Sequence, residues 1–291
     1  MKISAVIPTY NNEKDIGECI ESLLNQTRKF HEIIVVDSSS RDKTQEIVKS
    51  YKKIRLITAG RGRSLARNLG WIKSKGDIVA FIESDSVFDK DWLKHIAESF
   101  EKGADAVIDR RQVYKPETFI SRMNNEIFSM RMKKENYKPF SAWVFKREVL
   151  EKTKGFDNHL EAAEDVDLGT RTKQEGFVIV YQPSSVQYHK GEPKNLKELF
   201  KREWWFGKNM KNYYEKYPEK FPLVRGMGLF SLPLIFVFNW TLGFLMLLAY
   251  LIFAFVKPFR KGLKFKYASA NALLSLPRNY IYFISLISSY F

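Results

Sequence analysis

Residues 77–86 of the 291-residue chain read DIVAFIESDS, an apolar run that ends in two acids, Glu83 and Asp85. A short apolar run bounded by polar residues is typical of a strand buried on both faces of a sheet. The acids stand at i and i+2, so their side chains point the same way. They either cap a helix that starts near Asp89 or repel each other unless a cation lies beside them. The stretch predicts a Mg²⁺ or Mn²⁺ cofactor.

The same pattern of apolar runs recurs on both sides of this stretch. Further strands are predicted at 3–7, 32–37, 54–58 and 104–108, with helical spacing of apolar residues at 16–24, 47–51, 65–72 and 92–100. Farther along, the pattern predicts helices at 119–133 and 164–174 and strands at 142–145 and 177–181. Alternating strands and helices indicate an α/β fold with a mostly parallel sheet flanked by helices.

The ends of the first two predicted strands carry polar residues that could bind a ligand. The first ends in Pro8, Thr9 and Tyr10, and the second ends in Asp37 followed by serines. In an open α/β sheet, ligands bind beyond the carboxyl ends of the strands. An aspartate there can accept hydrogen bonds from a base or ribose, although each stretch alone could simply be a turn and a helix cap.

The third connection, residues 60–70, reads GRGRSLARNLG. Its glycines allow a close backbone turn, and Arg67 projects from the first turns of the predicted helix. A helix amino terminus with guanidinium groups suits a pyrophosphate. The alternative is that these arginines pair with acids.

The overall charge points to anionic partners. The formal net charge is +15, which suits acidic lipid headgroups, phosphorylated small molecules or nucleic acid. Nucleic-acid binding is disfavoured because the motifs are carboxylates at strand ends rather than a basic face with interleaved aromatics. The chain has one cysteine, Cys19, so core burial rather than an intramolecular disulfide must hold the fold.

The last third of the sequence predicts contact with a membrane. Residues 196–214 have the pattern of a basic amphipathic helix, and residues 226–256 contain no charged side chain. A run of that length exceeds the roughly 18 residues that indicate a membrane helix. Because the amino terminus has no signal peptide, we expect a cell-membrane protein with its first domain on the cytoplasmic face.

The number of membrane spans is left open by the sequence. Either 234–256 is one tilted span and 267–291 returns, or the first stretch is a re-entrant hairpin, with breaks at Pro233, Asn239 or Gly243. The basic run between them favours the hairpin, because the positive-inside tendency would keep it in the cytoplasm, whereas the length of the last segment favours two spans. Arg278 is expected to be either a snorkelling end residue or a ligand for a lipid phosphate.

These four strand-end and crossover stretches, in this order and spacing, resemble the inverting family 2 glycosyltransferases of GT-A fold. That group includes dolichyl-phosphate mannose synthases and polysaccharide synthases, and the resemblance covers residues 3 to about 209. It implies a Rossmann-like nucleotide-sugar domain followed by C-terminal membrane helices. The nucleoside would be held by Pro8, Thr9, Tyr10 and Asp37, and the diphosphate would lie near Arg67.

The resemblance also assigns roles to the acids. Glu83 and Asp85 stand where the family has Asp-x-Asp, which implies Asp85 as metal ligand and Glu83 near the ribose and metal. Glu164 and Asp165 match the family's Glu-Asp motif, which implies Asp165 as the general base. His189 lies where some relatives bring a third metal ligand, although a lone histidine is more often structural.

The segment 202–208, REWWFGK, lacks the Gln-x-x-Arg-Trp pattern of processive synthases, so single transfer is favoured over polymerisation. Arg202, Trp204, Trp205 and Lys208 are expected to meet the acceptor or lipid. Asp167 and Arg171 are four apart on a helix and are expected to pair structurally.

The sequence therefore predicts a metal-dependent inverting hexosyltransferase that moves a sugar from a nucleoside-diphosphate donor to a polyprenyl phosphate or lipid-linked glycan. The expected organisation is a catalytic domain at 1–220, with a nucleotide-sugar half at 1–108, an acceptor half at 109–194 and an interface helix at 195–220, followed by a membrane anchor at 221–291. The alternatives are a short-chain polysaccharide synthase and a non-catalytic, nucleotide-sugar-binding protein of the membrane surface. Neither the sugar, the base nor the oligomeric state is indicated.

Overall fold

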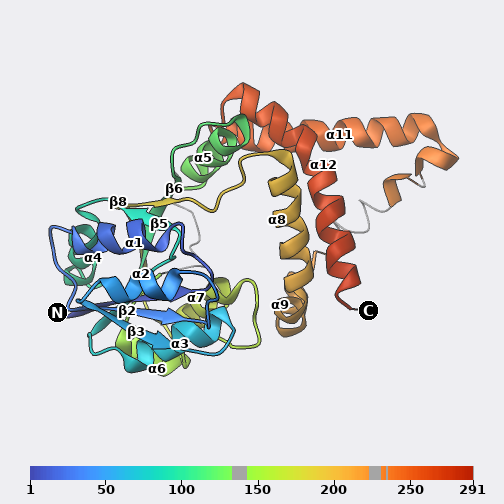
Figure 1. Cartoon of the computed structure of the whole chain (residues 1–291). Helices are drawn as coiled ribbons and strands as arrows, with labels where there is room; N and C mark the ends of the chain where they lie inside the picture. Colours follow the sequence, from blue (N-terminus) through green and yellow to red (C-terminus); the bar gives the residue numbers. More distant parts are fainter. Residues whose placement is uncertain (133–142, 223–230, 234, 291) are drawn as a thin grey trace. The chain divides into compact units, whose positions relative to one another are not determined.

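The computed structural model describes residues 1–132, 143–222, 231–233 and 235–290, which form two compact units (Figure 1). The first unit comprises residues 1–115 and 136–192, and the second comprises residues 116–135 and 193–291. The predicted helix at 119–133 therefore groups with the carboxyl-terminal segments and not with the sheet that precedes it.

The first unit is built on one sheet with the strand order β3-β2-β1-β4-β7-β6-β8-β5. Its first four strands are all parallel and confirm the predicted strand positions. They are β1 (Ile3–Thr9), β2 (Glu32–Asp37), β3 (Ile54–Thr58) and β4 (Ile78–Phe81). Because they run in one direction, their carboxyl ends meet at one edge of the sheet.

The second half adds antiparallel strands, so the mostly parallel sheet that the sequence predicted is also mixed. β7 (Val144–Lys146) lies antiparallel between β4 and β6 (Ala106–Val113). β8 (Ile179–His189) runs parallel to β6, and β5 (Ser86–Phe88) is antiparallel to β8. β8 continues eight residues beyond the predicted end at Tyr181, because this extension is the partner of both the end of β6 and the short β5.

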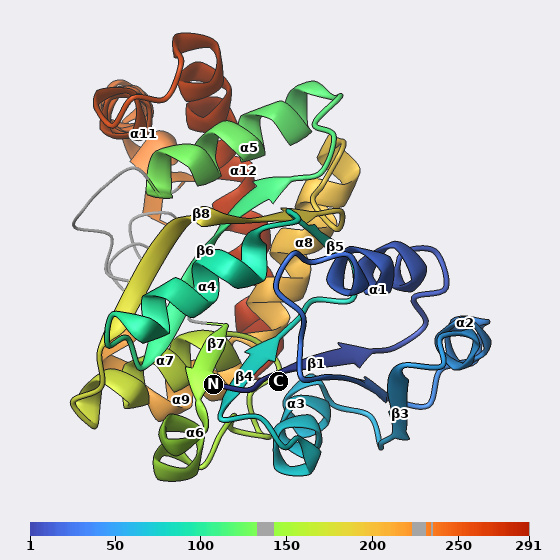
Figure 2. The ribbon, with the colours of Figure 1, turned by 90° about the vertical axis from the view of Figure 1, so that its left-hand side faces the viewer.

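Two helical layers cover the faces of this sheet (Figure 2). Alternate residues of β1 serve the two layers: Ala5 and Ile7 join one core, and Val6 joins the other. The first core includes side chains from α1 (Ile16–Leu24), α2 (Thr44–Ser50) and α4 (Trp92–Glu101). The second includes side chains from α3 (Arg63–Lys73), α6 (Arg147–Thr153) and α7 (Glu164–Gln174). Cys19 is fully buried in the first core, as expected of a core-filling residue.

The second unit is helical. It contains α5 (Phe119–Met132), α8 (Leu196–Asn209), α9 (Lys211–Lys216), the 3-10 turn η1 (Pro218–Lys220), α11 (Trp240–Arg260) and α12 (Phe265–Ser288). α5 packs on the start of α12 through Met123 and Ala268. The predicted helix at 196–214 thus breaks into α8 and α9.

α8 and α12 lie side by side in close contact (Figure 1). A Cβ added to Gly207 would fall 2.2 Å from the carbonyl oxygen of Tyr282, so only glycine permits this approach. Arg278 donates to Glu203 of α8 from Nε at 2.9 Å. The arginine that the sequence left as a snorkelling residue or a lipid ligand therefore pairs with a carboxylate of its own unit.

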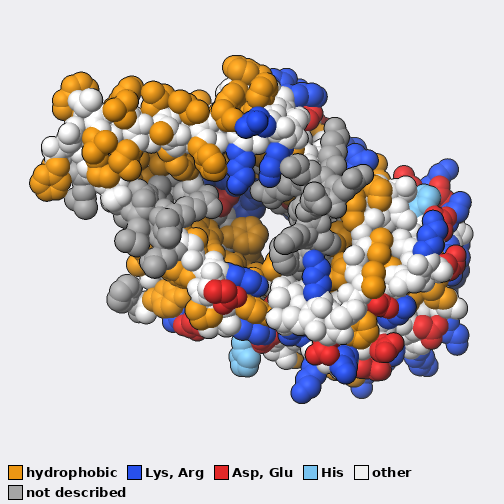
Figure 3. Space-filling view, turned by 180° about the vertical axis from the view of Figure 1, so that it is seen from behind, with side chains coloured by type: hydrophobic (Ala, Val, Ile, Leu, Met, Phe, Trp, Pro, Cys, Tyr) orange, Lys and Arg blue, Asp and Glu red, His pale blue; other side chains and the backbone are white. Residues whose placement is uncertain are grey.

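α11 carries the apolar stretch that the sequence singled out. Asn239 caps it by accepting from the Leu242 amide, so the chain does break at this predicted position. The most apolar 18 residues of α11 have a mean hydropathy of 2.1, and 6% of them are buried. Among the described residues, α11 is the one helix long and apolar enough to cross a membrane. Apolar side chains cover it in Figure 3. Part of the predicted stretch, residues 226–230 and 234, lies outside the described residues.

Two glycines in helices of the first unit provide a matched test of how closely these helices pack against their neighbours. At Gly70 of α3, an added Cβ would lie 2.2 Å from Val6 Cγ1, whereas at Gly17 of α1 the nearest atom would be 3.6 Å away. We expect Gly70→Ala to cost about 1–3 kcal/mol through overpacking, and Gly17→Ala to be neutral or slightly stabilising. Thermal unfolding of both variants in detergent checks this; a Gly70→Ala protein as stable as wild type would contradict the packing.

Candidate active site

Asp37 forms the first corner of the site, at the end of β2. Its carboxylate is fully buried and accepts from Ser40 Oγ at 2.5 Å, from the Ser40 amide at 2.9 Å and from Gln45 Nε2 at 2.7 Å. These bonds close the turn that follows β2, in which Ser39 adopts φ 62°. The turn and the carboxylate are therefore one preorganised unit.

Beside it, the end of β1 supplies an aromatic surface. Pairing of Thr9 with Asp37 aligns the two strand ends, and the next residue, Tyr10, is 42% exposed. Arg61 lies over the Tyr10 ring, 5.2 Å from its centre, and donates to its hydroxyl at 2.9 Å. An exposed ring with a guanidinium on its face can stack with a planar ligand. Pro8 is half-buried and is paired with Val36 in the same register.

Hydrogen bonds connect this corner to the two acids beyond β4. The Asn11 amide donates to Ser40 Oγ at 2.8 Å, and Asn12 Nδ2 donates to Ser84 Oγ at 2.9 Å. Ser84 stands between Glu83 and Asp85. The polar residues predicted at separate strand ends are thus joined along one edge of the sheet.

The acids beyond β4 meet a histidine from the end of β8. The β5–β8 register places Ser86 opposite His189. As a result, His189 Nε2 lies 3.3 Å from Asp85 Oδ2 and 3.7 Å from Glu83 Oε2. Residues 83, 85 and 189, which the sequence grouped as metal ligands, are brought together.

Two further charged residues belong to this cluster and were not predicted. Arg111 of β6 lies 3.1 Å from Glu83 and 3.2 Å from Glu192, measured between guanidinium nitrogen and carboxylate oxygen. Glu192 is buried, and its Oε1 is also 3.5 Å from His189 Nδ1. The available signal was the alternation of β6, which points Arg111 and Asp109 to one side, together with the proximity of Glu192 to His189 in sequence.

The charges of the cluster shift each other's protonation. Burial acts to raise the pKa of Asp85, but the hydrogen bond and charge of His189 outweigh burial and hold it below its usual value. Burial and Arg111 act to lower the pKa of His189, yet Glu83 and Asp85 raise it to about 9. Without a metal, the imidazole is therefore protonated at neutral pH and serves as the cation of the cluster.

These residues would suit a divalent cation for which the protein supplies only some of the ligands. Within the described ranges, no group of three or more His, Cys, Asp or Glu side chains is arranged to hold a metal ion by itself. Mg²⁺ typically takes one or two carboxylates and completes its shell with water and substrate phosphates. Glu83 Oε2 is buried and has no hydrogen bond among the described residues, although Arg111 is close. Two carboxylates and an imidazole that face one another are suitable ligands for a cation whose other ligands come from water and the substrate.

Arg67 lies in a different environment from the one its motif suggested. Its side chain is buried, Nη1 donates to Glu164 at 2.6 Å, and the guanidinium lies about equally close to the rings of Trp143 and Phe156. Arg63, which is exposed, lies 3.7 Å from the same carboxylate. Arg67 thus anchors the start of α7 to α3 in this structure, and its predicted contact with a diphosphate remains a prediction.

Asp165 follows Glu164 in the first turn of α7. Burial acts to raise the pKa of Glu164, but Arg67 and Arg63 hold it below its usual value, so Glu164 is ionised. Burial, followed by the charge of Glu164, raises the pKa of Asp165 to about 6. A carboxylate with a pKa near the working pH has the property that a general base needs.

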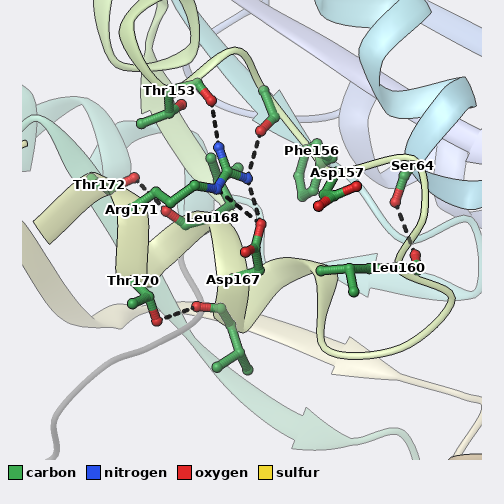
Figure 4. A network of polar contacts seen from close by, with 12 residues as sticks. Ser64, Thr153, Phe156, Asp157, Leu160, Asp167, Leu168, Thr170, Arg171 and Thr172 are labelled. Atoms are coloured by element: carbon green, nitrogen blue, oxygen red, sulfur yellow. Dashed lines mark hydrogen bonds and ion pairs between the residues drawn. The ribbon is translucent and has the colours of Figure 1, made fainter. Parts of the chain in front are cut away.

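Asp167 is the structural acid of this segment, as the sequence predicted. It is fully buried and pairs with Arg171 through bonds of 2.9 and 2.6 Å (Figure 4). Arg171 also donates to the carbonyls of Thr153 and Gly155. The network ties α7 to the end of α6 and so fixes the helix that presents Asp165.

The predicted acceptor residues Arg202, Trp204, Trp205 and Lys208 all lie on α8, in the second unit. Trp204 and Trp205 are exposed, and the Trp204 carbonyl accepts from Ser285. Their predicted role in acceptor or lipid binding is not tested by these contacts.

Comparison with known proteins identifies the family. Residues 4–153 match the family model described as Glycosyl transferase family 2. The chain belongs to the family 2 glycosyltransferases, and it is a glycosyltransferase.

Individual relatives share the domain at moderate identity. The chain is similar to glycosyltransferase AglE of Haloferax volcanii, with 27% identity over 71% of this chain and 72% of that protein. It is also similar to the uncharacterized glycosyltransferase EpsJ of Bacillus subtilis, with 26% identity over 68% of this chain and 63% of that protein.

A solved structure shares the fold. The crystal structure of Staphylococcus aureus TarS 1–349 in complex with UDP aligns with a TM-score of 0.56 and 19% identity, over 99% of this chain and 91% of that one. In sequence, full-length TarS, a poly(ribitol-phosphate) β-N-acetylglucosaminyltransferase, is 37% identical over 33% of this chain and 18% of that protein.

The raised pKa of Asp165 predicts a pH-dependent effect on stability. The folded protein binds this proton more tightly than the unfolded chain does, so ionisation destabilises the fold increasingly as pH rises from about 4 to about 6 and fully above that. We expect Asp165→Asn to raise the melting temperature at pH 7.5 and to raise it less at pH 5. Asp167→Asn, which breaks an ion pair, should lower it. An Asp165→Asn effect independent of pH would contradict the assignment.

Proposed function

We propose that this chain transfers a sugar, with inversion, from a uridine-diphosphate sugar to an acceptor held at a membrane surface. The acceptor class is a polyprenyl phosphate or a lipid-linked glycan. The proposal rests on one observation: hydrogen bonds along one edge of the sheet connect the Asp37 turn, where the nucleoside would bind, to the cluster of Glu83, Asp85 and His189. The uridine base is supported by the UDP bound to the structurally similar TarS protein.

The donor would bind along this edge of the sheet. The Tyr10 ring would stack with the base, and the Asp37 turn would hold the nucleoside beside Pro8 and Thr9. Asp85 and His189, with Glu83 beside them, would hold Mg²⁺ or Mn²⁺. When bound, the cation offsets charge that develops on the departing diphosphate. Arg67 would approach the donor only by leaving Glu164, so we assign it first to the support of α7.

Asp165 would take the proton from an attacking acceptor hydroxyl. Its raised pKa makes it a stronger base than an ordinary aspartate, and it is ionised above about pH 6. Ionised Glu164 beside it opposes a second negative charge and so favours proton uptake by Asp165 as the reaction proceeds. With a polyprenyl phosphate, whose oxygen is already ionised, Asp165 would orient the acceptor instead.

The second unit would bring the domain to the bilayer. α11 presents large apolar side chains to its surroundings, including Phe244 and Phe253, and it ends in the basic residues Lys257 and Arg260. An apolar helix with a basic end suits hydrocarbon bordered by anionic headgroups. Trp204 and Trp205 of α8 are exposed, and tryptophan is enriched where a protein meets the membrane–water interface. We place the catalytic unit on the cytoplasmic face.

The base assignment predicts a pH profile. Because Asp165 must be ionised to accept a proton, kcat/KM should fall below about pH 6, with one proton taken up. Asp165→Asn should lower kcat by about 10²–10⁴-fold with a hydroxyl acceptor, while donor affinity stays near that of wild type. Retention of most activity with a hydroxyl acceptor would exclude the base role. Asp157→Asn, at a half-buried position before α7 where either side chain can accept from the His159 amide, serves as a control.

The donor assignment predicts selective, metal-dependent stabilisation. We expect UDP-sugars with Mn²⁺ to raise the melting temperature of the purified protein, and GDP-sugars or Mn²⁺ alone to raise it much less. Saturation at 100 times Kd corresponds to about 2.7 kcal/mol. Equal stabilisation by both bases would contradict the uridine proposal, and stabilisation by UDP-sugar without turnover in any acceptor assay would favour a non-catalytic binding protein.

A further inference from the structure

We propose that Glu192 is a positioning residue that aims His189 at the cation, an inference that rests on the cation site of the proposed function. Glu192 Oε1 lies behind the imidazole, 3.5 Å from His189 Nδ1, while Nε2 faces Asp85 at 3.3 Å. The two ring nitrogens thus face different carboxylates, one on each side of the ring.

This arrangement sets which ring nitrogen can bind a metal. A metal-binding imidazole must offer the lone pair of one nitrogen, and it carries its proton on the other. Nδ1 is buried and lacks a hydrogen bond among the described residues, and the nearby acceptor is Glu192 Oε1 at 3.5 Å. A proton on Nδ1 facing Glu192 leaves Nε2 free to face Asp85 and Glu83. Carboxylates behind metal-binding histidines commonly act in this way.

Arg111 holds Glu192 in place for this role. The same Oε1 atom that faces His189 is 3.2 Å from Arg111, whose other terminal nitrogen is 3.1 Å from Glu83. The guanidinium therefore links the carboxylate behind the imidazole to a carboxylate in front of it. Rotation of Glu192 away from the ring would cost a contact with the half-buried Arg111 cation, so its position is well defined.

Gly191 allows the segment 189–192 to turn around Asp85. A Cβ at this position would lie 2.5 Å from Asp85 Oδ2 and 2.8 Å from His189 Cε1. Residue 191 must therefore be small for His189 and Asp85 to approach while Glu192 returns behind the ring. The sequence HKGE at 189–192 is thus one local unit: a ligand, a spacer, a glycine and the residue that orients the ligand.

The test measures Mn²⁺ affinity directly, by the electron paramagnetic resonance signal of free Mn²⁺, in detergent-solubilised protein with saturating UDP. We expect Glu192→Ala to weaken Mn²⁺ binding by about 10–100-fold, and Glu192→Gln, which keeps an acceptor oxygen and the volume, to weaken it less. Glu175 is an exposed acid 3.8 Å from Lys152, and a Glu175→Ala variant should bind Mn²⁺ like wild type.

A double-mutant cycle separates positioning from a general structural effect. In a His189→Ala background, Glu192→Ala should cause little further loss, because its partner is already absent. An equal loss in both backgrounds, or no loss in Glu192→Ala alone, would overturn the inference. UDP affinity without metal should be unchanged in Glu192→Gln; a parallel loss there would assign Glu192 a structural role and also overturn it.

Failure of the underlying proposal gives a different pattern. If wild-type protein bound no Mn²⁺ with UDP present, the cation site itself would be refuted together with the role of Glu192. If wild type bound Mn²⁺ and His189→Ala did not weaken it, His189 would not be a ligand and the role of Glu192 would fall alone, while metal-dependent transfer would stand.

Discussion

Mutual repulsion between closely spaced carboxylates is the constraint around which the catalytic unit is organised. Glu83, Asp85 and Glu192 converge at the carboxyl edge of the sheet, and they stay close because Arg111 and a protonated His189 lie between them. Replacement of the imidazole proton by a divalent ion would leave the balance of charge nearer to neutral. The same principle operates at α7, where two arginines keep Glu164 ionised and the neighbouring Asp165 is left with a raised pKa.

Local patterns predicted the parts of the fold that depend on local sequence. The four parallel strands and the helices that follow them are defined by apolar runs and helical spacing, and α7 was placed at its observed ends. The three-residue β5 was missed because its strand character comes from pairing with β8, far along the chain. The helix α6 was missed because it has only seven residues and directly follows β7.

The sequence predicted those parts of the site whose functional residues lie within a few positions of one another. The pair Glu83 and Asp85 could be recognised from the strand that ends beside it, and His189 could be suggested by its position. Arg111 and Glu192 were not predicted, because their contacts depend on how β6 pairs with β8. The register of that pairing shifts between Asp109 and Arg110. The contacts of Arg67 with Trp143 and Phe156 could not be predicted from its motif, because they are tertiary contacts.

The pairing of β5 with β8 has a consequence for where the catalytic unit can be divided. The family match ends at residue 153, yet β5 has its only sheet neighbour in β8, at residues 187–189, within the strands that the structure describes. A fragment that stopped at residue 153 would expose the backbone of both β5 and one side of β6. The part of this enzyme that matches the family model is therefore not an autonomous folding module. Dividing the chain at residue 153 would leave unpaired strand edges that favour association.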